Sequence, residues 1–132
     1  MKLIVAFLIL FAVACSAEYS KLWLHEVTRE GKQCMQKLSI SMADNVVERI
    51  MYNRGPTRDD MKYLRCFYIK FGILDANDKF VVDRAVEFEM DRYEEQEVRP
   101  VVTRCAKQDD PSVYERLWQF YQCFNTDKSL KA

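Results

Sequence analysis

The chain has 132 residues, of which 49% are hydrophobic, and its 20 Lys and Arg residues balance 20 Asp and Glu residues. This length suits one domain with a modest hydrophobic core. Because nucleic acids and anionic membranes bind proteins that carry a basic patch or stripe, the balanced charge argues against either partner.

Residues 1–17 have the three parts of a secretory signal peptide: a basic start at Lys2, the apolar run LIVAFLILFAVA and the small-residue finish CSA. We expect cleavage after Ala17 and a mature domain at 18–132. A site before Cys15, of the kind that bacterial lipoproteins use, is disfavoured because FAVAC lacks the usual leucine. The apolar run is too short to span a bilayer, and no later stretch reaches the roughly 18 apolar residues of a membrane helix. The sequence therefore predicts a secreted, extracellular protein without membrane insertion.

Helical periodicity runs through the mature chain, and no alternating run bounded by turn residues indicates a strand. The first helix is expected at 20–37, with a weak point at Gly31 because glycine is a poor helix former. A short second helix follows a possible N-cap at Ser41. Its apolar stripe consists of Val46, Val47, Ile50 and Met51.

A third helix is expected to begin after a cap at Thr57 or Asp59 and to end at Gly72, and a polar turn, LDANDK, follows it. The fifth helix should carry Pro100 in its first turn, and the sixth should cover 112–124. The residues that mark the fourth helix are Val82, Ala85, Val86 and Met90. The predicted fold class is all-α, with about six helices.

Once Cys15 leaves with the signal peptide, the remaining cysteines are Cys34, Cys66, Cys105 and Cys123. An even number of cysteines in a small secreted chain predicts two disulfides. A zinc site is disfavoured because metal-binding cysteines usually come in close pairs, and these are widely spaced. We expect no metal and no cofactor.

The last predicted helix, SVYERLWQFYQCF, has apolar groups over most of its circumference, which is typical of a helix enclosed by others. Its aromatic residues can simply fill a core. However, 17 aromatic residues in so short a chain are also well suited to lining a cavity. Cavities for small organic molecules are lined by such side chains together with a few polar groups.

The cysteine spacing and the stretch KYLRCFYIKFGILDANDKF make the chain recognisable: it resembles the insect odorant-binding protein family, of the pheromone-binding and general-odorant-binding type. In six-cysteine members, three residues separate the second and third cysteines, and eight separate the fifth and sixth. Aligned on Cys66 and Cys123, the missing cysteines fall at Lys62 and Tyr114. The chain therefore resembles the four-cysteine (Minus-C) subclass, which has lost one whole bridge. The resemblance implies that Cys34 pairs with Cys66, and Cys105 with Cys123.

The resemblance also implies six helices around an apolar cavity that carries small hydrophobic molecules through an extracellular fluid, such as sensillum lymph or haemolymph, without catalysis. The implied partners are a small hydrophobic ligand, a chemosensory receptor or a second copy of the chain. Tyrosine hydroxyls in the lining can orient a polar head. The residues expected to line the cavity are Leu64, Phe67, Tyr68, Phe71, Val86, Met90, Tyr114, Leu117, Trp118 and Tyr121.

Two functions from different classes fit this sequence. The first is an extracellular carrier of odorants, pheromones, fatty acids or similar molecules; the second is a secreted helical protein that acts through protein–protein contacts. A filled core or an exposed apolar patch would favour the second. A third, weaker interpretation is an amine carrier, for which Asp44 and Glu48 would supply acidic groups. Catalysis is not expected, since the single histidine, His25, lies far in sequence from any cysteine.

Overall fold

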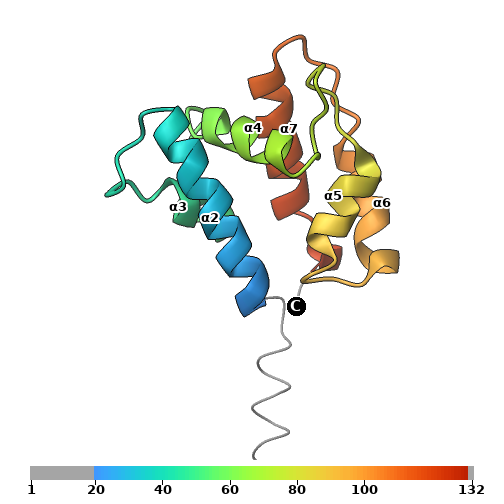
Figure 1. Ribbon diagram of the computed structural model, residues 1–132. Coiled ribbons are helices and arrows are strands. Elements are labelled where there is room, and N and C mark those ends of the chain that lie inside the picture. Colours follow the sequence, from blue (N-terminus) through green and yellow to red (C-terminus); the bar gives the residue numbers. More distant parts are fainter. Residues whose placement is uncertain (1–19, 131–132) are drawn as a thin grey trace, which may run out of the picture.

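The computed structural model describes residues 20–130, so the predicted signal peptide at 1–17 lies outside the described residues. The described chain is all-α, as predicted, and its only β feature is an isolated bridge between Leu74 and Phe80. No helix within 20–130 is long and apolar enough to cross a bilayer. The elements are α2 (Lys21–Lys37), α3 (Val46–Met51), α4 (Met61–Lys70), α5 (Val82–Glu89), α6 (Glu95–Cys105), α7 (Val113–Asn125) and the 3-10 helix η1 (Lys128–Leu130) (Figure 1).

Several helix ends lie where local chemistry predicts them. Ser20 caps α2, because its Oγ accepts a hydrogen bond from the backbone N–H of Trp23 at 3.2 Å. Ser112 caps α7 in the same way through the N–H of Glu115. Gly72, with a φ of 72°, follows α4 and ends it in the left-handed conformation that glycine adopts readily.

Three predicted helix starts are wrong. The third predicted helix, α4, has Asp60 as its N-cap residue, so neither Thr57 nor Asp59 caps it. The fifth predicted helix, α6, begins at Glu95 instead of near Pro100, because acidic residues favour a helix N-terminus and Val98 is fully buried in the earlier turn. Pro100 thus lies inside the helix. Ser41 does not cap α3: its Oγ accepts from the N–H of Ala43 within the preceding turn.

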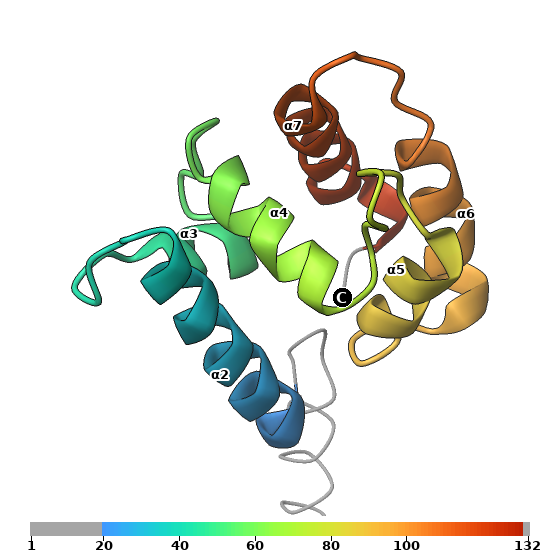
Figure 2. The ribbon, with the colours of Figure 1, turned by 45° about the horizontal axis from the view of Figure 1, so that its top comes forward.

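Helix α4 is the central element, because it packs against both α2 and α7, while α5 packs on α6 and α6 on α7. Figure 2 shows α4 between α2 on one side and the α5, α6 and α7 group on the other. The disulfide Cys34–Cys66 joins α2 to α4, and Cys105–Cys123 joins α6 to α7, so both implied pairings are confirmed. Each disulfide therefore fixes one side of the helical arrangement.

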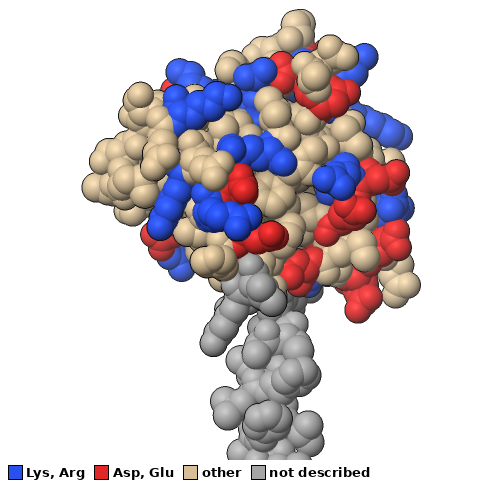
Figure 3. Space-filling model, viewed as in Figure 1, with Lys and Arg blue, Asp and Glu red and all other residues tan. Residues whose placement is uncertain are grey.

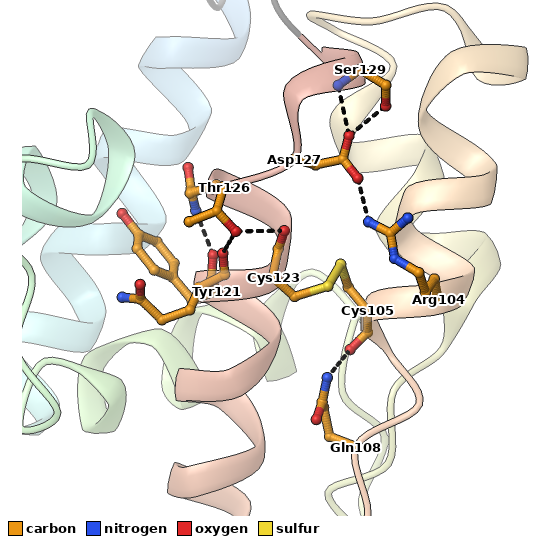
Figure 4. The surroundings of a disulfide bond; sticks show 10 residues. Arg104, Cys105, Gln108, Tyr121, Cys123, Thr126, Asp127 and Ser129 are labelled. Carbon is orange, nitrogen blue, oxygen red and sulfur yellow. Dashed lines mark hydrogen bonds and ion pairs between the residues drawn. A yellow bond between two sulfur atoms is a disulfide. The ribbon is translucent and has the colours of Figure 1, made fainter.

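The Cys105–Cys123 disulfide stands in a polar setting near the end of α7 (Figure 4). Gln108 donates to the carbonyl of Cys105 at 3.0 Å, and Arg104 pairs with Asp127. Hydrogen bonds from the hydroxyl of Ser129 and from Arg104 lower the pKa of Asp127 to about 2. These contacts tie the chain beyond α7 back to α6.

Gly31 allows α2 and α4 to approach closely. The helix is continuous through Gly31, and a Cβ at this position would lie 2.3 Å from the hydroxyl oxygen of Tyr63. That hydroxyl is buried and has no hydrogen-bond partner among the described residues. Gly31, which the sequence predicts to weaken the helix, therefore leaves the space that the Tyr63 hydroxyl occupies.

We predict that Gly31→Ala destabilises the protein only while Tyr63 keeps its hydroxyl. The clash costs about 1 to 3 kcal/mol, which outweighs the roughly 1 kcal/mol by which alanine exceeds glycine in helix propensity. In the Tyr63→Phe background the same substitution should raise the free energy of unfolding by up to ~1 kcal/mol. Urea unfolding of the four variants measures this; equal effects of Gly31→Ala in both backgrounds would contradict it.

Candidate ligand-binding site

A partly open cavity of about 50 Å³, lined mostly by buried residues, lies where α3, α4, α5 and α7 meet. Most of its wall is aromatic or aliphatic, and the polar groups come from the end of α5, the connection to α6 and the end of α7. The lining residues are Ile50, Met51, Tyr63, Leu64, Phe67, Tyr68, Phe88, Glu89, Arg92, Phe120, Tyr121, Phe124 and Asn125.

Helices α4 and α7 supply matching faces of the wall. On α4 the lining positions are 63, 64, 67 and 68, and on α7 they are 120, 121, 124 and 125, so each helix presents neighbouring turns of one face. The two faces meet edge to face, with the ring centroids of Tyr68 and Phe120 6.2 Å apart. Phe88 of α5 closes a third side against Phe67 at 5.7 Å.

Polar groups of the wall are mostly hydrogen bonded. The hydroxyl of Tyr121 donates to the carbonyl of Ile50 at 2.5 Å, which fastens α3 to α7. Burial raises the pKa of Tyr121 to about 12, so this hydroxyl stays protonated and remains a donor. Asn125 donates to the carbonyl of Tyr121 at 2.9 Å. Glu89 and Arg92 form an ion pair at 3.0 Å.

The short helix α3 is held over the cavity by a two-point ion pair. Arg49 donates through Nε and Nη2 to the carboxylate of Asp60, at 2.8 and 2.7 Å. Burial alone would raise the pKa of Asp60, but the hydrogen bonds from Arg49 and from the N–H of Thr57 outweigh it and hold the pKa below its usual value. Asp60 is thus a charged anchor at the start of α4.

A family model, that of the PBP/GOBP family, matches residues 16–127. The chain belongs to this family. Its members are the insect odorant- and pheromone-binding proteins, which carry small hydrophobic ligands and are not enzymes. Comparisons with curated proteins and with solved structures give no significant match. Membership of the four-cysteine subclass stays a prediction.

Four of the ten residues expected to line the cavity of this family member are on its wall: Leu64, Phe67, Tyr68 and Tyr121. The other six lie elsewhere. Phe71 packs behind the wall against Trp23, and Val86 and Leu117 are fully buried in the core. Met90 and Tyr114 are exposed, and the ring of Trp118 lies under the guanidinium of Arg58, at 5.0 Å.

Sequence reasoning missed nine of the wall residues. The aromatic ones on α7 were visible in the sequence, but a helix with apolar residues all round has no periodicity to indicate which face borders a cavity. The charged ones are inconspicuous because Arg92 lies within the charged stretch DRYEEQE at 91–97 and Glu89 just before it, and charge runs are mostly solvated. The residues missed are Ile50, Met51, Tyr63, Phe88, Glu89, Arg92, Phe120, Phe124 and Asn125.

A separate hollow of about 210 Å³ lies beside Cys66, and it includes both Lys62 and Tyr114, the positions at which the four-cysteine interpretation predicts a lost bridge. The Lys62 ammonium points to solvent and pairs with Asp59 at 3.1 Å, as a charge that avoids burial should. Basic side chains are more frequent over the α2 and α4 side of the molecule, and acidic ones over the α5 and α6 side (Figure 3).

We predict that Asp60→Asn lowers the free energy of unfolding by about 2 kcal/mol near neutral pH, because Arg49 loses a charged acceptor. The pKa of Asp60 is lower in the folded state, so its contribution is complete above the unfolded value of about 4 and is lost as the pH falls through the folded value. The difference between variant and wild type should therefore shrink in acid. Urea unfolding as a function of pH measures it.

Asp59→Asn is the matched control, because Asp59 precedes Asp60 and pairs with Lys62 in solvent. Its effect should stay below about 0.5 kcal/mol at every pH. An Asp60→Asn difference that persisted undiminished in strong acid would contradict the anchoring role.

Proposed function

We propose that this protein is a secreted carrier that binds a small hydrophobic molecule, such as an odorant, a pheromone or a fatty acid, in the cavity between α3, α4, α5 and α7 and transports it through an aqueous fluid. The single observation that carries the proposal is the aromatic cavity with a few polar groups in its wall. Such a lining suits a ligand that is largely apolar and has one polar group. Delivery to a chemosensory receptor and assembly with a second copy are the partner interactions that this function implies.

Ligand entry requires the cavity to enlarge. Its volume of about 50 Å³ is well below the roughly 300 to 1,000 Å³ of pockets for small organic ligands. Helix α3 is the wall segment best placed to move, because it is one short helix that neither disulfide holds. Its attachments are the Arg49–Asp60 pair, the Tyr121 hydroxyl and the packing of Val46 and Ile50. We therefore expect the ligand to displace α3 and to leave the disulfide-bonded pair of α2 and α4 in place.

A second candidate function is supported by two observations. The small cavity comes close to a filled core, and three large apolar residues, Leu38, Ile69 and Tyr114, are exposed around the surface hollow beside Cys66. A protein that acts through contacts with a protein partner would have both features. Ligand binding inside the cavity distinguishes the two functions.

We predict that the folded protein binds the neutral fluorescent probe N-phenyl-1-naphthylamine saturably, and that Leu64→Phe weakens binding by about tenfold, because the larger side chain fills the cavity. Ile69→Phe is the matched control on the same helix, since Ile69 is 40% exposed and does not line the cavity. Probe titration with circular dichroism on each variant measures this. Equal weakening by both substitutions would contradict the internal site.

We predict that the intrinsic fluorescence responds to decanol through Trp23 and not through Trp118. The ring of Trp23 lies 5.2 Å from Phe88 of the cavity wall, whereas Trp118 is covered by Arg58. The emission change should persist in Trp118→Phe and disappear in Trp23→Phe. The reverse result would return Trp118 to the cavity lining and overturn the lining described above.

A further inference from the structure

The Glu89–Arg92 ion pair is the most enclosed in the described part of the chain. The two side chains are only 12% and 14% exposed, and Glu89 Oε2 lies 3.0 Å from Arg92 Nη2. In every other ion pair between residues 20–130, at least one partner is 27% exposed or more. Both side chains border the cavity. The pair therefore puts a carboxylate and a guanidinium within reach of whatever occupies the cavity.

Stability alone does not explain this pair. Removing two charges from water costs several kcal/mol per ion, and well-packed apolar residues of similar volume often stabilise a fold as well or better. Burial raises the pKa of Glu89 in spite of the attraction of Arg92, because loss of water disfavours the charged carboxylate. An ion pair with this cost, on a wall that is mostly aromatic or aliphatic, calls for a role other than stability.

The charges of the pair decide which ligand heads fit beside it. A ligand carboxylate that approaches Arg92 also comes close to the Glu89 carboxylate. A ligand ammonium that approaches Glu89 also comes close to Arg92. In both cases like charges meet, and they repel strongly in a medium of low polarity. A hydroxyl avoids both problems, because it can donate to a carboxylate and accept from a guanidinium while the pair stays intact. It also adds no net charge to the cavity.

We propose that the Glu89–Arg92 pair makes the cavity selective for uncharged ligands that bear a hydroxyl group on an apolar body, and that it disfavours carboxylates and amines of the same length. This inference rests on the proposed carrier function and names the ligand class of that site. Of the odorants, pheromones and fatty acids that a carrier could bind, it favours the alcohols.

The test is competition of decanol, decanoate and decylammonium against N-phenyl-1-naphthylamine near neutral pH. We expect decanol to bind the wild-type protein at least about tenfold more tightly than either charged ligand. Glu89→Gln removes the negative charge beside Arg92 and should shift the preference toward decanoate. Arg92→Gln should shift it toward decylammonium.

Arg84 and Glu87 offer a matched control, because they form an exposed ion pair with the same spacing on α5, 3.3 Å apart. Arg84→Gln and Glu87→Gln should leave the affinity order unchanged. Decanoate or decylammonium bound as tightly as decanol by the wild-type protein would overturn the proposal, and so would equal shifts of all three ligands in the Glu89 and Arg92 variants.

The order of the three affinities is measured on the wild-type protein, so it tests the proposal even where a substitution prevents folding. The outcomes also separate the two levels of inference. Probe binding with the wrong ligand order overturns the selectivity alone, whereas a folded wild-type protein that bound neither the probe nor decanol would overturn the carrier function and the selectivity with it.

Discussion

The disulfide between Cys34 and Cys66 is the constraint on which the cavity depends, because it fixes α2 against α4, the helix that supplies much of the aromatic wall. At the same interface, Gly31 leaves room for the hydroxyl of Tyr63, and the helices approach more closely than any larger residue at 31 would permit. Trp23 then covers the outer side of the wall near Phe88. One side of α4 is thereby held against α2, and the neighbouring face borders the cavity, with Tyr63 contributing to both.

The helices around this cavity differ in how they are held. Disulfides hold α2 to α4 and α6 to α7, whereas α3 is attached only by non-covalent contacts: an ion pair, one tyrosine hydrogen bond and the packing of Val46 and Ile50. Ion pairs and hydrogen bonds can exchange partners with water, so breaking them costs far less than distorting a disulfide-bonded helix pair. A carrier must bind in one place and release in another. A wall with one lightly attached segment meets this requirement without unfolding the core.

The helical architecture followed from local patterns in the sequence. Apolar spacing indicated each helix, and Ser20 and Gly72 marked two of the ends correctly. The start of α6 lies earlier than predicted because proline usually marks a first turn, whereas here the acidic residues Glu95 and Glu97 form the first turn and Pro100 follows it. The disulfide pairing came from the family resemblance, since four cysteines alone permit three connectivities.

The cavity wall was harder to predict than the fold. Periodicity distinguishes a buried face from an exposed one, but both the cavity side and the packed side of α7 are buried. Leu117 and Tyr121 look equivalent in the sequence, and only the second borders the cavity. Glu89 and Arg92 are not predicted as wall residues because charged residues are normally exposed. Their burial depends on the path of the chain between α5 and α6.

The most direct test of the central claim, that the ligand site is the internal cavity, is an isotope-filtered NMR experiment on the protein with bound decanol. The account predicts intermolecular nuclear Overhauser effects from the alkyl chain to Ile50, Leu64 and Phe67, which line the cavity. Effects confined to Leu38 and Ile69, at the surface hollow beside Cys66, would contradict it and would identify a surface-binding protein.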